Sequence, residues 1–264
     1  LYRMDRLADR PSVPELAPHQ STPAAVPMTQ LLHLGEGASR HGDMRAIAWN
    51  AVLPEQVATA ERRTVRLWQL SHGAAASSAA EVGAAAPPGA GAECGACKWD
   101  PHHAHSLALG VDHDIVTLDA RTMKEAVAVG AAHEQRVASL DYNPNRPNAV
   151  LSAGDDYHVR WWDLRKPSAP LLALRAHSHW VTSATFNRFH DQLALSTGTD
   201  GAVKLWRAGA ASSAPTADEA ADEAEEDGLV EAFETHDTTV VGAVWSAADA
   251  WDFCSLSIDG KVAI

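Results

Sequence analysis

Two stretches of this sequence decide its fold, because the second repeats the first after 44 residues. Residues 153–163 read Ala-Gly-Asp-Asp-Tyr-His-Val-Arg-Trp-Trp-Asp, and residues 197–207 read Thr-Gly-Thr-Asp-Gly-Ala-Val-Lys-Leu-Trp-Arg. The same offset joins four pairs of landmarks: His133 and His177, Tyr142 and Phe186, Asp156 and Asp200, and Trp162 and Trp206. Four landmarks that share one offset indicate a structural repeat.

The repeat extends in both directions along the chain. Downstream, the equivalents of His177, Phe186, Ser196 and Asp200 are His236, Trp245, Ser255 and Asp259, each 59 residues later, and an acidic stretch supplies the extra 15 residues. Upstream, Trp99, Asp112 and Leu118 take the places of Tyr142, Asp156 and Trp162, and Trp49 and Trp68 do so again, with Arg62 where the aspartate should be. Five units are recognisable, and residues 1–4 could be the tail of a sixth.

This period, with a histidine near its start and a Trp-Asp pair near its end, is the signature of a WD-repeat propeller blade. Apolar patterns predict strands within residues 181–186, 193–196 and 203–206, separated by turn formers such as Asp200-Gly201. We therefore predict an all-β WD40 β-propeller over residues 1–264, with a flexible low-complexity loop at 71–91 and a disordered acidic insertion at 211–228. Because both ends look cut, we expect a fragment of about five to six blades.

Within each blade, four residue types are expected to form a hydrogen-bonded relay from Trp through Ser and His to Asp, because polar groups near a core need partners. The candidates are His133, Ser152, Asp156 and Trp162; His177, Ser196, Asp200 and Trp206; and His236, Ser255 and Asp259. The alternative is a Ser-His-Asp catalytic triad. A nucleophile has no reason to recur every 44 residues, so we predict a structural relay in a protein that is not an enzyme. The units around Arg62 and Ala108 lack relay members.

Two cysteines raise the question of a metal site. Cys94 and Cys97 form a Cys-x-x-Cys pair, followed by His102, His103 and His105. A zinc site is the alternative here, but the chain between Cys97 and His102 is too short for a finger. A redox pair would need a strand–helix context that is not visible. We interpret the cysteines as small core or loop residues and expect no metal and no cofactor.

The net charge of the chain limits which classes of partner it can bind. A formal net charge of −13 argues against nucleic acid, because phosphate binding needs a basic face. No apolar run has the length of a membrane span, and three cysteines favour a reducing compartment, the cytoplasm or nucleus. Seven acidic residues within 217–227 are interpreted as a solvated loop, with a regulated partner-binding loop as the alternative.

Several stretches carry more than the general repeat pattern. They are residues 41–44, 99–103, 140–145, 177–181, 190–193, 245–251 and 255–260. His-Asp-Gln-Leu at 190–193 and Trp-Ser-Ala-Ala-Asp at 245–249 are not general WD motifs. In these stretches, and in the acidic insertion before the last blade, the chain resembles the EARP- and GARP-complex-interacting family, the TSSC-type WD-repeat proteins. The resemblance covers most of the chain from about residue 31 onward.

This resemblance implies a seven-bladed propeller that associates with endosomal and Golgi tethering complexes. It further implies a scaffold or adaptor role in endosomal recycling to the plasma membrane and in retrieval to the trans-Golgi network. The expected location is cytoplasmic and peripheral at those membranes, without membrane insertion.

Two pairs of residues are candidate protein-binding groups. Asp163 and Arg165 lie in Trp-Asp-Leu-Arg, which resembles the Trp-Asp-x-Arg box of WD proteins that dock on the cullin-4 ubiquitin-ligase adaptor. A ligase substrate receptor is therefore the second functional hypothesis, with a plain surface arginine as the alternative. His179 and Trp180 are expected on the narrow top face, where Trp is a frequent interface residue. The alternative is that Trp180 packs against the neighbouring blade.

Overall fold

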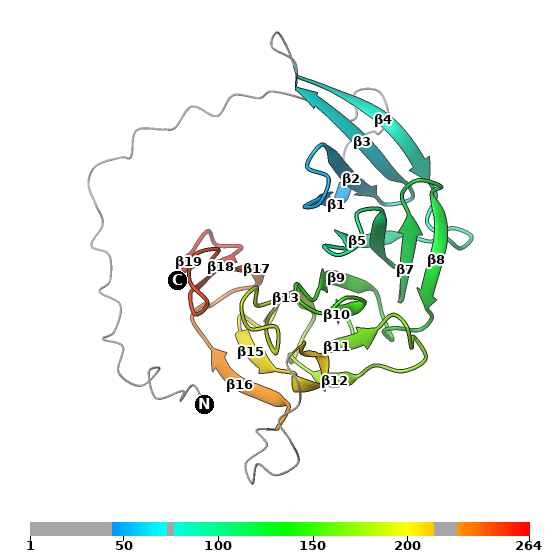
Figure 1. Cartoon of the computed structure of the whole chain (residues 1–264). Helices are drawn as coiled ribbons and strands as arrows, with labels where there is room; N and C mark the ends of the chain where they lie inside the picture. Colours follow the sequence, from blue (N-terminus) through cyan, green and yellow to red (C-terminus); the bar gives the residue numbers. More distant parts are fainter. Residues whose placement is uncertain (1–43, 73–76, 214–225) are drawn as a thin grey trace, which may run out of the picture. The chain divides into compact units, whose positions relative to one another are not determined.

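The computed structural model describes residues 44–72, 77–213 and 226–264. All of them belong to one compact unit, Leu34–Ile264, and a second unit, Leu1–His33, lies outside the described residues. The described residues form five antiparallel sheets, which we number blades 1 to 5 in chain order. Figure 1 shows the sheets following one another along the chain, with β4, β8, β12 and β16 at their outer edges.

Each blade is built from strands that are consecutive in the sequence. Blade 1 contains β1 (Met44–Trp49), β2 (Gln56–Glu61), β3 (Val65–His72) and β4 (Ser77–Ala85), and blade 2 contains β5 (Cys94–Trp99), β6 (Ser106–Val111), β7 (Asp114–Asp119) and β8 (Lys124–Val129). Blade 3 contains β9 (Val137–Tyr142), β10 (Ala149–Gly154), β11 (His158–Asp163) and β12 (Leu172–Arg175). Blade 4 contains β13 (Val181–Phe186), β14 (Leu193–Gly198), β15 (Val203–Arg207), a short 3-10 helix η1 (Gly209–Ala211) and β16 (Gly228–Phe233), and blade 5 contains β17 (Val240–Trp245), β18 (Phe253–Ser257) and β19 (Val262–Ala263).

Consecutive blades pack face to face, with the first strand of each blade against the first strand of the next. Four hydrophobic clusters fill the spaces between them, one for each neighbouring pair of blades. Strands β10 and β14 are buried along their whole length, because their sheets are covered on both faces. This two-sided packing explains why the second strand of a unit is a continuous run of apolar and small residues.

One carboxylate connects three blades near their first strands. Asp141 of β9 forms an ion pair with Lys98 of β5, with Nζ 3.0 Å from Oδ1. Its Oδ2 accepts hydrogen bonds of 2.9 Å from the Thr185 hydroxyl and the Phe186 N–H of β13. Asp141 is buried, and its ties to both neighbours fix how blades 2, 3 and 4 are placed.

The all-β propeller fold is confirmed, but the number of blades differs from the expected seven-bladed architecture. Residues 44–72, 77–213 and 226–264 form five blades and no sixth or seventh. The expected loop at 71–91 is wrong in part, because Ser77–Ala85 forms β4 and pairs with β3. The small side chains of this segment suit a strand over which a neighbour packs: a Cβ on Gly83 would lie 3.2 Å from Met123 Cγ of blade 2. Most of the expected acidic insertion, residues 214–225, lies outside the described residues.

Candidate functional site

The relay residues of blade 3 form a continuous hydrogen-bonded chain. The Trp162 indole N–H lies 2.9 Å from Ser152 Oγ, this oxygen lies 2.7 Å from His133 Nε2, and His133 Nδ1 lies 2.9 Å from Asp156 Oδ1. The register of the sheet explains the first contact, because Ser152 lies opposite Arg160, two positions from Trp162. All four residues are buried.

Protonation in this chain follows from matching donors to acceptors. Burial lowers the pKa of His133 and keeps the ring neutral, with one N–H. Burial raises the pKa of Asp156, but hydrogen bonds from His133, the Glu134 N–H and Arg160 outweigh this, so its pKa lies well below its ordinary value. The ring therefore donates from Nδ1 to a carboxylate and accepts the Ser152 hydroxyl at Nε2, while Ser152 Oγ accepts the indole N–H.

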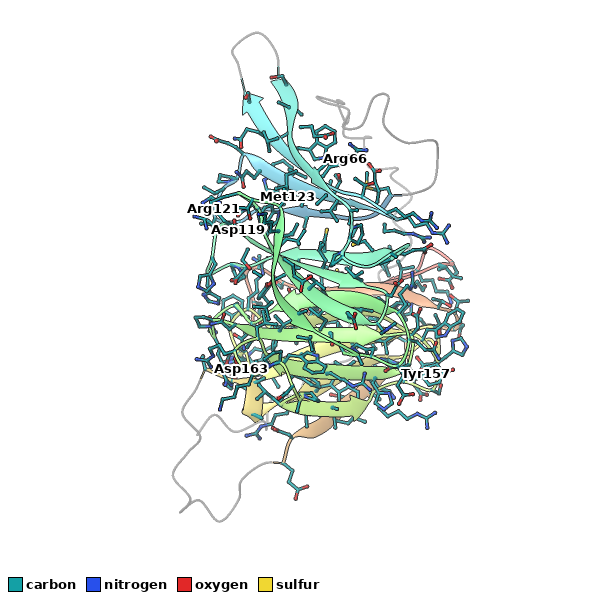
Figure 2. All side chains as sticks on the ribbon, turned by 90° about the vertical axis from the view of Figure 1, so that its right-hand side faces the viewer. Arg66, Asp119, Arg121, Met123, Tyr157 and Asp163 are labelled. Carbon is teal, nitrogen blue, oxygen red and sulfur yellow. The ribbon has the colours of Figure 1, made fainter. Side chains whose placement is uncertain are left out.

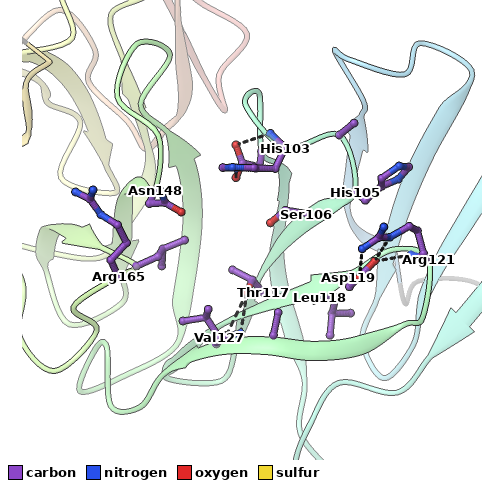
Figure 3. A pocket seen from close by; sticks show the side chains of 14 residues that line it. His103, His105, Ser106, Thr117, Leu118, Asp119, Arg121, Val127, Asn148 and Arg165 are labelled. Carbon is purple, nitrogen blue, oxygen red and sulfur yellow. Dashed lines mark hydrogen bonds and ion pairs between the residues drawn. The ribbon is translucent and has the colours of Figure 1, made fainter.

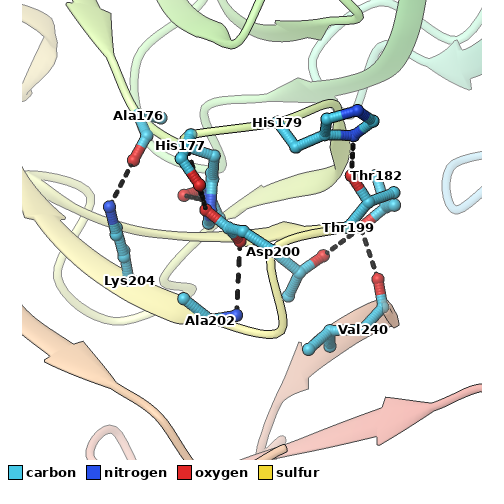
Figure 4. A network of polar contacts seen from close by, with 12 residues as sticks. Ala176, His177, His179, Thr182, Thr199, Asp200, Ala202, Lys204 and Val240 are labelled. Carbon is cyan, nitrogen blue, oxygen red and sulfur yellow. Dashed lines mark hydrogen bonds and ion pairs between the residues drawn. The ribbon is translucent and has the colours of Figure 1, made fainter. Parts of the chain in front are cut away.

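Blade 4 has the same arrangement, and Figure 4 shows its His177 beside Asp200. Trp206 donates to Ser196 Oγ at 2.8 Å, Ser196 Oγ lies 2.7 Å from His177 Nε2, and His177 Nδ1 lies 2.9 Å from Asp200 Oδ1. Burial lowers the pKa of His177 as it does for its counterpart.

The glycines at positions 154 and 198 make room for these histidines. A Cβ on Gly154 would lie 2.3 Å from His133 Nδ1, and one on Gly198 would lie 2.5 Å from His177 Nδ1. The backbone thus covers one side of each imidazole ring. Because Ser152 is also 0% exposed, its hydroxyl is not presented to a substrate as a catalytic nucleophile would be.

The relay predicted for blade 5 is formed only in part. His236 Nε2 lies 2.8 Å from Ser255 Oγ, but Asp259 bonds to the Ser257 hydroxyl and the Lys261 N–H rather than to the ring. His236 Nδ1 is buried and has no hydrogen-bond partner among the described residues. The physical reason is that Ser257 stands where the other two blades have Gly154 and Gly198, so a side chain occupies the space in which aspartate would meet histidine.

Blade 1 keeps half of a relay that the sequence did not reveal. The Trp68 indole donates to Thr59 Oγ1 at 2.9 Å, and Thr59 lies opposite Arg66, two positions from Trp68. This is the register of Ser152 and Trp162. The spacing from hydroxyl to indole is one residue shorter because the intervening turn is shorter, which hides the match from a fixed-offset comparison.

A second recurring feature, at the opposite ends of the first strands, was also missed. Each first strand ends in an aromatic residue followed by a polar one, which accepts the N–H groups two and three residues further on. These polar residues are Asn50, Asp100, Asn143, Asn187 and Ser246. The three asparagines also donate to the next blade, to the carbonyls of Ala104, Ala211 and Ala250 at 2.8, 3.0 and 2.7 Å. The recurrence of Asn143 and Asn187 at the 44-residue offset was the available signal.

The cysteine pair lies in the hydrophobic core between two blades. Cys94 and Cys97 are buried free thiols in the cluster between blades 1 and 2, and burial raises the pKa of each to about 12. His103 is bonded to Asp100, and His102 Nε2 lies 3.0 Å from the Asn143 carbonyl. The described part of the chain contains no group of three or more His, Cys, Asp or Glu residues that could hold a metal ion.

Asp163 and Arg165 form a bidentate ion pair at the end of β11. Arg165 donates from Nε and Nη2 to the two Asp163 oxygens at 2.9 and 2.7 Å, with its side chain 61% exposed. The hydrogen bond from Arg165 lowers the pKa of Asp163 and holds it as the anion. Asp119 and Arg121, each 44 residues earlier, repeat the same bidentate contact in blade 2.

The two arginines line one cavity between blades 2 and 3. The cavity has a volume of about 640 Å³, and its walls include His103, His105, Asn148 and Leu164 (Figure 3). Figure 2 shows Asp119, Arg121 and Asp163 on one side of the stacked sheets and Tyr157 on the other. The Asp-x-Arg pairs and the relay turns therefore mark opposite faces of these blades.

His179 and Trp180 lie in the loop between β12 and β13, on the relay-turn face. Both side chains are exposed, Trp180 at 48%. His179 Nδ1 lies 2.5 Å from Thr199 Oγ1 (Figure 4), and the Trp180 carbonyl accepts the Thr199 N–H at 2.9 Å. The loop is thus anchored to the β14–β15 turn while the indole stays in contact with solvent.

Known proteins resemble this chain both in sequence and in fold. A family model described as the EIPR1 β-propeller matches residues 33–206. The "EARP-interacting protein homolog" of Gekko japonicus is 32% identical, and the "EARP and GARP complex-interacting protein 1" of Homo sapiens is 31% identical, each over 94% of this chain and 68% of its own length. The "EARP-interacting protein 1" of Caenorhabditis elegans is 38% identical over 63% of this chain and 49% of its own. A chain in the crystal structure of the mitotic checkpoint complex aligns with a TM-score of 0.62 at 18% identity, over 81% of this chain and 56% of that one, which supports the fold alone.

These matches confirm the resemblance that the sequence stretches had predicted. The family model covers more than half of the chain, and the first two relatives cover nearly all of it. Among the described residues, no helix has the length and apolar character of a membrane span. The chain belongs to the EIPR1 β-propeller family.

Proposed function

We propose that this protein is a non-enzymatic adaptor that associates with EARP and GARP tethering complexes in endosomal recycling and in retrograde transport to the trans-Golgi network. The observation that carries this proposal is the 31–32% identity, over 94% of the chain, to relatives that are named for these complexes. Its place of action would be the cytoplasmic side of endosomes and the trans-Golgi network, reached through protein contacts.

The arrangement of polar groups supports a binding role. The nucleophile-like hydroxyls of Ser152 and Ser196 are buried inside the blades and already bonded on two sides. The exposed groups lie instead in turns on two opposite faces, with Arg121 and Arg165 on one and His179 and Trp180 on the other. Rigid sheets that present short loops on two faces suit a protein that holds other proteins.

The test is co-purification with defined complexes. Purified EARP and GARP complexes, each immobilised through one subunit, are incubated with this chain and with an unrelated WD propeller as the control. We expect retention of this chain at micromolar concentration or below and no retention of the control. If neither complex retains the chain above the control, the adaptor assignment is wrong.

A second candidate function is that of a substrate receptor on the cullin-4 ligase adaptor. The observation that favours it is the exposed Arg165, held by the buried Asp163 in a bidentate contact, and the repetition of this contact by Asp119 and Arg121 beside one cavity. The names of the relatives cited above lend it no support. Arg165→Ala should abolish binding to the purified cullin-4 adaptor and leave binding to the tethering complexes unchanged, and absence of binding by the unmodified chain would end this candidate.

A further inference from the structure

Three exposed or half-buried rings meet on the relay-turn face at the border of blades 3 and 4. Tyr157, in the β10–β11 turn, stacks on His179 with ring centroids 5.9 Å apart and an interplanar angle of 29°. His179 in turn contacts Trp180, with centroids 4.8 Å apart. The guanidinium carbon of Arg175 lies 5.8 Å from the centre of the Tyr157 ring. We call these four residues the aromatic platform.

Tyr157 has an unfavourable backbone conformation. Tyr157 has φ of +71°, in the left-handed region that bulky residues rarely adopt. The equivalent positions in blades 4 and 5 are Gly201 and Gly260, with φ of +83° and +81°. The turn therefore calls for glycine, and blade 3 carries a tyrosine there. Strain of this kind concentrates at sites of binding or catalysis.

The carboxylates nearest the platform are already bonded to other groups, whereas one of its cations is not. Asp155 is paired with Arg136 at 3.0 Å, and Asp156 and Asp200 accept the relay histidines and backbone N–H groups. Arg175 is exposed and has no carboxylate partner within the described residues. In a chain of net charge −13, the platform thus offers one free cation beside aromatic faces.

We propose that the aromatic platform is a docking site for a protein segment that places an aliphatic or proline side chain on the rings and a neighbouring carboxylate against Arg175. Ring faces bind apolar side chains, and a planar guanidinium pairs with a carboxylate in a bidentate manner. The proposal rests on the adaptor function and names the chemistry of one partner contact.

The design of the test uses variants that separate binding from folding. Tyr157→Gly removes the ring and also removes the backbone strain, so a docking role combines weaker binding with an unchanged or higher melting temperature. Trp180→Ala removes the exposed indole, and Arg175→Glu reverses the charge. The matched control is Trp251→Ala, because Trp251 is 50% exposed and lies 4.9 Å from the His190 ring, yet belongs to the opposite turns of blade 5.

The probe is a displayed library of random peptides, selected on the purified chain and counter-selected on the Trp180→Ala variant. We expect the recovered peptides to contain an aliphatic or proline residue next to Asp or Glu. Their affinity should fall at least about tenfold with Tyr157→Gly, Trp180→Ala and Arg175→Glu, and remain unchanged with Trp251→Ala. Recovery of no platform-dependent peptide, or of peptides without an acidic residue, overturns the proposal.

A parallel measurement separates this proposal from the adaptor function. The same variants are tested for binding to the purified EARP and GARP complexes. If the complexes do not bind the unmodified chain while platform-dependent acidic peptides do, the adaptor assignment fails and the platform stands. If the complexes bind but no such peptide is recovered, the platform proposal fails and the adaptor assignment stands.

Discussion

Replacement of Asp156 by alanine removes the acceptor on which the relay of blade 3 ends. Its side chain is only 3% exposed and receives four donors: His133 Nδ1, the N–H groups of Glu134 and His158, and Arg160 Nη1 at 2.7 Å. The alanine variant leaves these donors without their acceptor. Arg160, whose side chain is 14% exposed, becomes a poorly solvated cation without its partner.

The expected loss of stability is large because one member of a buried ion pair is removed. Such losses are about 3–5 kcal/mol. The same change at Asp200, which is 13% exposed and bonded to a neutral histidine and backbone N–H groups, should cost about 1–3 kcal/mol. Asp259 is 27% exposed and does not reach His236, so its replacement should cost the least of the three.

The assay is urea unfolding of the three variants, followed by tryptophan fluorescence. The reference is Asp237→Ala, whose side chain is 84% exposed. Asp227 is a poor reference although it belongs to the acidic stretch, because it accepts the Gly209 and Ala210 N–H groups. We expect the loss of unfolding free energy to follow the burial of each aspartate and the number of donors it accepts. Equal losses for the three aspartates, or the greatest loss for Asp259→Ala, would refute this expectation.

Three further outcomes are expected. Ser257→Gly should open the space between His236 and Asp259 and raise the urea unfolding midpoint, because the satisfied Nδ1 is worth about 1–3 kcal/mol and exceeds the backbone cost of glycine; an unchanged or lower midpoint would contradict this. Burial lowers the pKa of His133 and His177 in the folded state, so stability should be fully present above about pH 6.5 and fall below it by at most about 1.4 kcal/mol per pH unit for each histidine; equal urea midpoints on both sides of that pH would disprove it. Ile47 and Val244 are 64% and 61% exposed on apolar sheet faces, so the chain alone should self-associate in sedimentation experiments, and the double variant Ile47→Lys Val244→Lys should be less associated; identical sedimentation of both proteins would count against this explanation.

The sequence predicted those parts of the fold that depend on repeated side chains. The landmarks at one offset located β9 to β11 and β13 to β15, because burial on both sheet faces forces the same residue types into each blade. The strand β4 was not predicted, because Ala and Gly have low strand preference, although the segment pairs with β3 along its whole length. Tertiary pairing decides such a segment, and its own composition does not.

The candidate site shows the same division. The residues of the two complete relays could be predicted from the sequence. Each member is hydrogen-bonded to the next, so the same residue types recur at the same spacing in both blades. Asp259 could not be placed correctly from its own spacing, since the deciding residue is Ser257, two positions earlier, where a Cβ would crowd the ring. The aromatic platform was found only in part, because Tyr157 stands where blades 4 and 5 have glycine, and a repeat pattern does not mark an exception.

The asparagine turns have a consequence for how the protein assembles as it is made. Each of Asn50, Asn143 and Asn187 completes its own turn through its side-chain oxygen, but its amide nitrogen bonds to a carbonyl of the following blade. During synthesis, which proceeds from the N-terminus, blades 1, 3 and 4 therefore each lack one acceptor until the next blade leaves the ribosome. Assembly of these three blades therefore has a direction: the hydrogen bonds of each are completed only by the following blade, and a nascent chain paused directly after one of them should expose an asparagine amide without its acceptor.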